Sequence, residues 1–355
     1  MSTEQAVRAA LARVLDPEIR RPITELDMVR SVAVAGGAAS VDLVLTIVGC
    51  PAADTIERDV RAAVLGVPGL SSLDLAVGVM TVAEREALVT RLRGTRAMPF
   101  GPETLTRIYA VTSGKGGVGK STLTANLAVA LAARGLKVGL VDADVFGFSI
   151  PGILGLGPDD RPTKVGDLMM PPVAHGVSVI SIGMFVDGST AVSWRGPLLH
   201  RTIQQFLTDV WFGDLDVLLL DLPPGTGDVA ISIGQLLPHA SVLVVTTPQP
   251  AAADVAERSG LVARQTGQTV LGVVENMTGE LFGSGGGDAV AARLDVPVLA
   301  RIPLSVALRE GGDAGAPVVL ADPGDPAAAA ILSLADTLAA RGRDLTARKL
   351  PLSPR

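Results

Sequence analysis

A glycine-rich segment near the middle of the chain limits the possible folds more than any other feature. Residues 114–121 read GKGGVGKS and fit the pattern G-x-x-x-x-G-K-[S/T]. The apolar run Ile108–Thr112 precedes this segment, and a helical pattern over Thr122–Arg134 follows it. Glycines let backbone N–H groups converge on phosphate oxygens, and the N-terminus of the next helix adds a positive dipole. The segment therefore predicts a strand–loop–helix unit that binds phosphate groups of a nucleotide.

The scarcity of lysine strengthens this prediction. The 355-residue chain has only five lysines, and two of them, Lys115 and Lys120, lie in this segment. A chance match is therefore rare. We expect Lys120 to reach the β- and γ-phosphates of ATP and Ser121 to offer its hydroxyl to Mg²⁺. The predicted nucleotide-binding residues here are Gly114, Lys115, Gly116, Gly117, Val118, Gly119, Lys120, Ser121 and Thr122.

The chain after residue 105 alternates short apolar runs with helical patterns. The expected strands are Ile108–Thr112, Val138–Val141, Val177–Ile182, Val217–Leu220, Val242–Thr246, Val270–Val274 and Val298–Ile302. Continuous apolar runs are typical of strands buried on both faces. Alternation with helices predicts an α/β fold with a doubly wound, mostly parallel sheet. Ligands of such sheets bind outside the carboxyl ends of the strands.

Aspartates stand at two of these strand ends. Asp142 and Asp144 follow the second expected strand, and Asp221 follows the fourth. An apolar strand that ends in aspartate is typical of a carboxylate held rigidly beside Mg²⁺. The alternative for Asp142 and Asp144 is that they cap the next turn. Asp221 is expected to support the metal.

The first part of the chain has a different pattern. Helical periodicity over 4–14 and 52–65, and strand patterns at Val32–Val34, Val41–Val48 and 73–79, predict a small α+β domain. The expected organisation is this domain at 1–93, a linker at 94–105, a P-loop ATPase domain at 106–340 and a disordered tail at 341–355. The tail's alternative is a segment that contacts a partner.

Composition excludes several classes of protein. The net charge of −6 and the aromatic content of 3% argue against a nucleic-acid partner, which would need basic surface and aromatic stacking platforms. No apolar run approaches the about 18 residues of a membrane span, and no signal-peptide pattern is present. Cys50 is the only cysteine, so no intrachain disulfide forms. The expected location is the cytoplasm, without membrane binding.

Lys115 adds a second signature, K-G-G-x-G-K-[S/T], which resembles the deviant Walker A ATPases of the MinD and ParA type. The resemblance implies a homodimer around ATP in which Lys115 reaches the partner's nucleotide; the alternative is an exposed loop lysine. It also implies that Asp221 and Asp142 lie at the Mg²⁺ site and that Asp144 positions the attacking water. Asn276 would read the adenine edge and Pro303 would line the base or ribose, unless each is a turn residue.

The closer resemblance is to the Mrp/ApbC iron–sulfur cluster carrier ATPases. It rests on VTSGKGGVGKST, VDADVFGFSIP, LLLDLPPGTGD, VVENM and FGSGGG, and on a SufT-like N-terminal domain with DPE at 16–18 and TIVGCP at 46–51. The chain departs from the family at one place, because the Cys-Pro-x-Cys segment expected before Phe282 is absent. Cys50 alone remains as an iron–sulfur ligand, or else as a buried, inert thiol.

The resulting functional hypothesis is an Mg²⁺-dependent ATPase that assists iron–sulfur cluster assembly, or delivery to recipient apoproteins, through a nucleotide-gated homodimer. The alternative is a MinD/ParA-like regulatory or positioning ATPase that acts on a protein partner without carrying a cluster. A scaffold that binds ATP without hydrolysing it is a third possibility. Residues 327–340 contain no basic residue, which argues against a MinD-like membrane-binding helix.

Overall fold

The computed structural model describes residues 2–93, 99–145, 147–186 and 196–341. The expected linker and tail therefore fall partly outside the described residues, at 94–98 and 342–355. The chain divides into two compact units. The first comprises Met1–Ala97, Pro162–Pro172 and Asp209–Gly213, and the second comprises Met98–Arg161, Val173–Thr208 and Asp214–Arg355. Residues 162–172 and 209–213, within the range expected for the ATPase domain, thus belong to the first unit.

The first unit packs helices on a three-stranded sheet. The elements are α1 (Thr3–Leu11), β1 (Val29–Ala35), β2 (Ala38–Leu45), α2 (Ala53–Leu65), β3 (Ser72–Val79) and α3 (Val82–Arg93). The sheet order is β1-β2-β3, with β1 antiparallel and β3 parallel to β2. A capping box between Ser2 and Gln5 starts α1. Helix α3 was not expected; Thr81 and Glu84 form a second capping box at its start.

A hairpin from the middle of the chain completes the core of this unit. It consists of β6 (Thr163–Val165) and β7 (Leu168–Met170), paired antiparallel. Val165, Leu168 and Met170 are buried in the same apolar cluster as residues of α1, α2 and β2. Thr163 Oγ1 also donates a hydrogen bond to Glu18 Oε1 at 2.9 Å. The apolar core of the first unit therefore includes side chains from beyond the P-loop.

The second unit is built on an eight-stranded sheet of order β13-β12-β11-β4-β10-β5-β9-β8. The strands are β4 (Arg107–Ser113), β5 (Val138–Asp142), β8 (Val173–Ala174), β9 (Val177–Ser181), β10 (Val217–Asp221), β11 (Ser241–Thr246), β12 (Thr269–Thr278) and β13 (Val298–Pro303). All neighbours pair in parallel except β8 and β9. The predicted doubly wound, mostly parallel sheet is confirmed, and the short antiparallel β8 is an addition at its edge.

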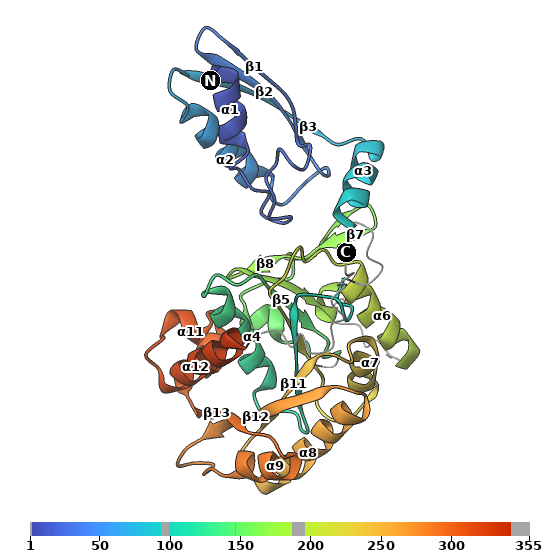
Figure 1. The fold of residues 1–355 in the computed structure, drawn as a ribbon. Coiled ribbons are helices and arrows are strands. Elements are labelled where there is room, and N and C mark those ends of the chain that lie inside the picture. The colour runs from blue at the N-terminus through green and yellow to red at the C-terminus, as the bar shows by residue number, and fades with distance from the viewer. Residues whose placement is uncertain (1, 94–98, 146, 187–195, 342–355) are drawn as a thin grey trace, which may run out of the picture. The chain divides into compact units, whose positions relative to one another are not determined.

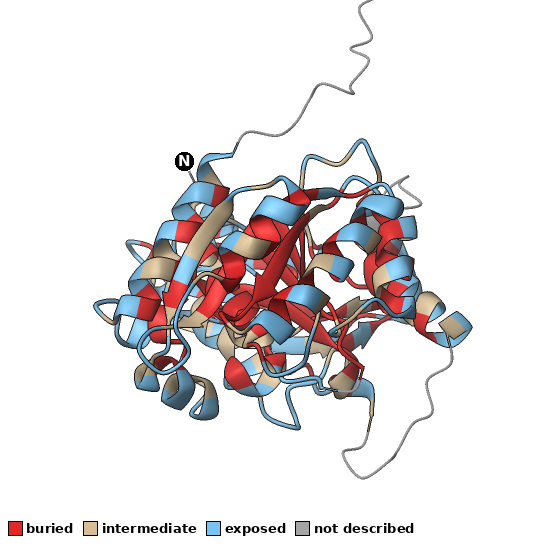
Figure 2. Ribbon diagram, turned by 90° about the horizontal axis from the view of Figure 1, so that it is seen from below, coloured by how far each residue is buried: buried red, intermediate tan, exposed pale blue. Residues whose placement is uncertain are grey.

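Helices cover both faces of this sheet (Figure 1). One face carries α4 (Lys120–Ala132), α11 (Val318–Ala321) and α12 (Pro326–Ala340), and the other carries α7 (Asp228–Leu236), α8 (Pro250–Gln265) and α9 (Gly286–Leu294). The remaining elements are α5 (Ile150–Ile153), the 3₁₀ helix η1 (Ile182–Phe185), α6 (Gly196–Thr208) and α10 (Val306–Asp313). Figure 2 shows the buried strands between these layers. Strands β5 and β10 are buried at every residue, as their continuous apolar runs predicted.

The described part of the chain contains no helix that is both long enough and apolar enough to cross a bilayer.

Candidate nucleotide-binding site

The glycine-rich loop lies between β4 and α4, as predicted, and its glycines are required by its surroundings. Gly119 has φ 79° at the start of α4, and a Cβ there would stand 2.3 Å from Asn276 Nδ2. A Cβ on Gly114 would stand 2.1 Å from the carbonyl carbon of Val255 on α8. Neither position can hold a larger residue without displacing its neighbours. The loop is therefore fixed between α8 on one side and the end of β12 on the other.

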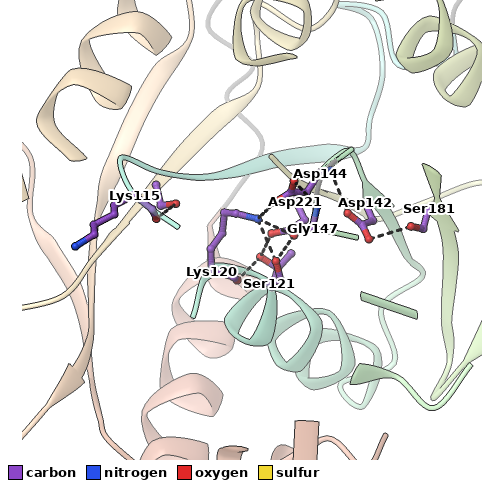
Figure 3. Close-up of polar contacts among 10 residues, drawn as sticks. Lys115, Lys120, Ser121, Asp142, Asp144, Gly147, Ser181 and Asp221 are labelled. Carbon is purple, nitrogen blue, oxygen red and sulfur yellow. Dashed lines mark hydrogen bonds and ion pairs between the residues drawn. The ribbon is translucent and has the colours of Figure 1, made fainter. Parts of the chain in front are cut away.

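Lys120 lies in a buried polar cluster at the start of α4 (Figure 3). Its Nζ is 2.8 Å from Asp221 Oδ2 and 3.7 Å from Asp144 Oδ2, and it donates to Ser121 Oγ at 3.1 Å. Ser121 Oγ in turn donates to Asp221 Oδ2 at 2.6 Å, and Thr124 Oγ1 donates to Asp221 Oδ1 at 3.0 Å. The fold thus brings together Lys120, Ser121, Asp144 and Asp221, which the sequence had assigned to one site.

Asp142 is held behind this cluster. Its Oδ1 accepts the Asp144 N–H at 3.1 Å, and its Oδ2 accepts the Ser181 hydroxyl at 2.9 Å. Burial, followed by the nearby Asp221 carboxylate, raises the pKa of Asp142 to about 8. Burial also raises the pKa of Asp221, while the charge of Lys120 acts in the opposite direction. Burial therefore disfavours the charged form of both carboxyl groups, and added positive charge nearby would favour it.

The residues fit a magnesium ion that arrives with a nucleotide. Ser121 lines a cavity of about 620 Å³ together with Asp144, whereas Asp142 and Asp221 are fully buried behind it. No group of three or more His, Cys, Asp and Glu side chains suited to a metal occurs among the described residues. Mg²⁺ favours a few protein oxygens, several waters and phosphate oxygens over an all-protein cage. A site with one hydroxyl and nearby carboxylates matches this preference.

The cavity is lined by most of the predicted loop, from Lys115 to Thr122. A second cavity of about 570 Å³ shares Gly119, Thr122 and Ser149 with it and is lined further by Asn276 and Pro303. The first cavity therefore has suitable residues for phosphates, and the second has suitable residues for a base. Asn276 Nδ2 donates to the Val118 carbonyl at 2.9 Å, so its amide also holds the loop. Lys115 is exposed and points away from Lys120 (Figure 3).

Three contributors to the site were not predicted from the sequence. Thr124 binds Asp221 one helical turn after Lys120, so its spacing from the loop was the available signal. Ser181 ends β9 and reaches Asp142 because β9 pairs with β5. Helix α10 adds Arg309 and Asp313 to the second cavity. The position of Ser181 depends on the strand order, and that of Arg309 and Asp313 depends on where α10 packs. No local sequence pattern indicates either.

Cys50 lies in the first unit, in a different environment. Its side chain is buried, and burial is the main cause that raises the pKa of the thiol, with the Glu18 and Asp16 carboxylates adding to the rise. Asp16 is itself buried and accepts the N–H groups of Glu18 and Ile19 at 2.9 and 2.8 Å. The two N-terminal motifs therefore meet in the fold, around a thiol kept in its neutral form.

Comparison with known proteins identifies both parts of the chain. Residues 104–339 match the family of NUBPL iron-transfer P-loop NTPases, and residues 4–73 match the iron-sulfur cluster assembly protein family. The iron-sulfur cluster carrier protein of Mycobacterium tuberculosis (strain ATCC 25618 / H37Rv) is 53% identical over 98% of this chain and 96% of its own. That of Synechocystis sp. is 39% identical over 96% of this chain and 98% of its own.

Solved structures agree with the fold. A nucleotide-binding protein from Archaeoglobus fulgidus, in complex with ADP, has 37% identity and a TM-score of 0.52 over 59% of this chain and 86% of its own. The septum site-determining protein MinD from Pyrococcus horikoshii, complexed with Mg-ADP, has 28% identity and a TM-score of 0.53 over 66% of this chain and 96% of its own. The resemblance drawn from the motifs is confirmed: this chain belongs to the family of iron–sulfur cluster carrier P-loop NTPases.

Proposed function

We propose that this protein is an Mg²⁺-dependent ATPase that assists iron–sulfur cluster assembly or delivery to recipient apoproteins. The observation that carries the proposal is the buried cluster in which Lys120 and Ser121, at the wall of a cavity of about 620 Å³, meet Asp221 behind it. The names of the relatives supply the cluster role, and the ADP and Mg-ADP in the two solved neighbours support ATP and Mg²⁺ as cofactors.

Each polar group of the cavity has a task in this proposal. The N–H groups from Gly116 to Thr122 surround the phosphates, and Lys120 turns from Asp221 toward the β- and γ-phosphates. Ser121 would hold Mg²⁺ with its hydroxyl, and the buried Asp221 and Asp142 would support the metal from behind the cavity. Asp144, which lines the cavity, accepts a hydrogen bond from the attacking water. When bound with the nucleotide, Mg²⁺ would supply positive charge that stabilises the negative charge of the phosphates.

The proposed dimer follows from Lys115. This exposed lysine points away from the Lys120 cluster of its own chain, so it is available to a nucleotide bound by a second copy. There it would stabilise the charge that develops on the transferred phosphoryl group. ATP would close such a dimer and hydrolysis would open it, which makes nucleotide the gate for cluster transfer.

The chain offers few thiolate ligands for a cluster. One buried cysteine per chain gives two thiolates per dimer, whereas a cluster is held by four ligands. This observation favours a second candidate, a MinD/ParA-like ATPase of the reducing cytoplasm that acts on a protein partner without carrying a cluster.

Anaerobic reconstitution with iron and sulfide tests the two candidates. Iron and acid-labile sulfide are counted on the wild type and on Cys50→Ser, with and without Mg-ATP. A stable cluster that is lost in Cys50→Ser supports the carrier role through Cys50. ATP turnover without any cluster favours the regulatory ATPase, and absence of Mg-ATP binding would overturn both.

A further inference from the structure

Two consecutive residues at the carboxyl end of β12 reach opposite sides of the sheet. Successive side chains of a strand point to opposite faces. Glu275 accepts hydrogen bonds from the start of α9, on one face, and Asn276 donates to the loop that precedes α4, on the other. The exposed fractions of Glu275 and Asn276 are 0% and 4%. One dipeptide thus joins the phosphate loop to the glycine-rich segment 283–287.

The Glu275 carboxylate is tightly held. Its Oε1 accepts the N–H of Gly285 at 2.7 Å and of Gly287 at 3.0 Å. Its Oε2 makes no hydrogen bond among the described residues and lies 3.4 Å from Arg301 Nε. A buried carboxylate with a single cation nearby is costly to displace, because any shift loses the N–H donors that compensate for its burial. The side chain therefore fixes the end of β12 relative to α9.

The residues around this contact are closely packed. A Cβ on Gly287 would stand 2.7 Å from Glu275 Cβ, and a Cβ on Gly286 would stand 2.5 Å from the Thr247 carbonyl oxygen. On the opposite face, Gly119 has only hydrogen where a Cβ would meet Asn276. Met277, the next residue, has φ 59°, a conformation that non-glycine residues rarely adopt. The position of Asn276 is thus determined from both sides.

We propose that Glu275 is a positioning residue of the nucleotide site, which acts through Asn276 on the phosphate loop and on the adjoining base cavity. This inference rests on the proposed nucleotide binding. Without the anchor on α9, the end of β12 is free to shift, and the Asn276 amide no longer stands at 2.9 Å from the Val118 carbonyl. The effect is on nucleotide affinity, because Glu275 lies outside the Lys120 cluster and does not line either cavity.

A double-mutant cycle on the full chain tests the assignment. Glu275→Gln keeps the size of the side chain but replaces the charge and places an amide against Arg301. Mg-ADP affinity is measured by calorimetry for the wild type, Glu275→Gln, Asn276→Ala and the double variant, with KM and kcat for ATP. Glu275→Gln should weaken Mg-ADP and raise KM about tenfold, the effect of losing one charged hydrogen bond, with kcat nearly unchanged. In the Asn276→Ala background the same change should have less than about twofold effect.

Asp288→Asn is the matched control. Asp288 is the other carboxylate on Arg301, at 2.5 Å from its Nη2, and it is exposed. This variant should bind Mg-ADP like the wild type. If Glu275→Gln does not fold by circular dichroism, Glu275→Asp replaces it, because the shorter acid keeps the charge but cannot reach both N–H groups.

The outcomes separate this inference from the proposed function. Additive effects in the cycle, or a loss of kcat at constant KM, overturn the positioning role while nucleotide binding stands. An equal loss in Asp288→Asn also overturns it and assigns the effect to Arg301. Failure of the wild type to bind Mg-ADP overturns the proposed function and this inference together.

Discussion

Lys120 Nζ lies 2.8 Å from Asp221 Oδ2, and both side chains are almost fully buried. An ion pair in this environment keeps its Coulomb attraction, but each ion has lost its hydration. The pair therefore stabilises the fold only while both members are present. The pair also holds the Lys120 ammonium group beside the position expected for the phosphates. When a nucleotide binds, Lys120 would exchange the Asp221 carboxylate for a phosphate group.

Lys120→Ala should abolish ATP turnover, with a loss of about 100-fold or more, the usual size for removal of a group that stabilises transition-state charge. It should also lower stability by about 3 kcal/mol because Asp221 is left as an uncompensated buried carboxylate. Steady-state phosphate release and urea unfolding measure the two effects. Lys137→Ala, at an exposed lysine of the same unit, should leave both unchanged. Wild-type turnover in Lys120→Ala would contradict the site assignment.

Lys115→Ala should keep Mg-ADP affinity within about twofold and reduce kcat by about 1,000-fold or more, the range for a cation that a partner supplies to phosphoryl transfer. The reason is that this exposed side chain points away from its own Lys120 cluster. Calorimetry and phosphate release separate the two parameters. An equal collapse of binding and turnover would place Lys115 in its own chain's site and remove the argument for a partner copy.

Asp142 predicts a pH-dependent stability. Its pKa is raised from 3.8 in an ordinary environment to about 8 in the fold, so the folded state holds a proton that the unfolded state has released. Stability should therefore fall as the pH rises between these two values. Asp142→Asn keeps the shape without the titration and should flatten this slope. Thermal unfolding from pH 5 to 8, without nucleotide, compares the two proteins; identical slopes would show that the carboxyl is not held protonated.

Cys50 should react slowly in the folded protein. Its side chain is buried and its thiol pKa is raised, so little thiolate is available near pH 7. Alkylation by iodoacetamide at pH 7.5 should be at least about tenfold slower in buffer than in urea, and the rate should keep rising above the ordinary thiol pKa. Mass spectrometry after quenching counts the adduct. Equal rates in buffer and urea would mean that the thiol is accessible, which would strengthen its case as a ligand.

Arg107 should matter for stability rather than for chemistry. Its Nη1 donates to the carbonyls of Leu338 at 3.0 Å and Ala339 at 2.8 Å, at the negative end of α12. Arg107→Met should lower the free energy of unfolding by about 1–2 kcal/mol, with KM and kcat unchanged. Arg258→Met, at an exposed position on α8, serves as the control in urea unfolding. A change in KM would instead connect α12 to the nucleotide site.

The strand ends were predictable because local signals define them. Asp142 and Asp221 each follow an apolar run, and parallel strands end at one edge of the sheet. Ser181 was not predictable, since only the sheet order brings β9 beside β5. Thr163 was not predictable for a similar reason, because its bond to Glu18 joins residues 145 positions apart. Local periodicity indicates elements and their ends, whereas the pairing of distant elements depends on the energy of the whole fold.

The β6–β7 hairpin has a consequence for biosynthesis. Residues 2–93 emerge from the ribosome first. Val165, Leu168 and Met170 of the same apolar core emerge only after the phosphate loop and β5. The apolar core of the first unit is therefore incomplete until residues 165–170 have been translated. The unit that carries Cys50 can therefore complete its core only after the nucleotide-binding loop has been synthesised.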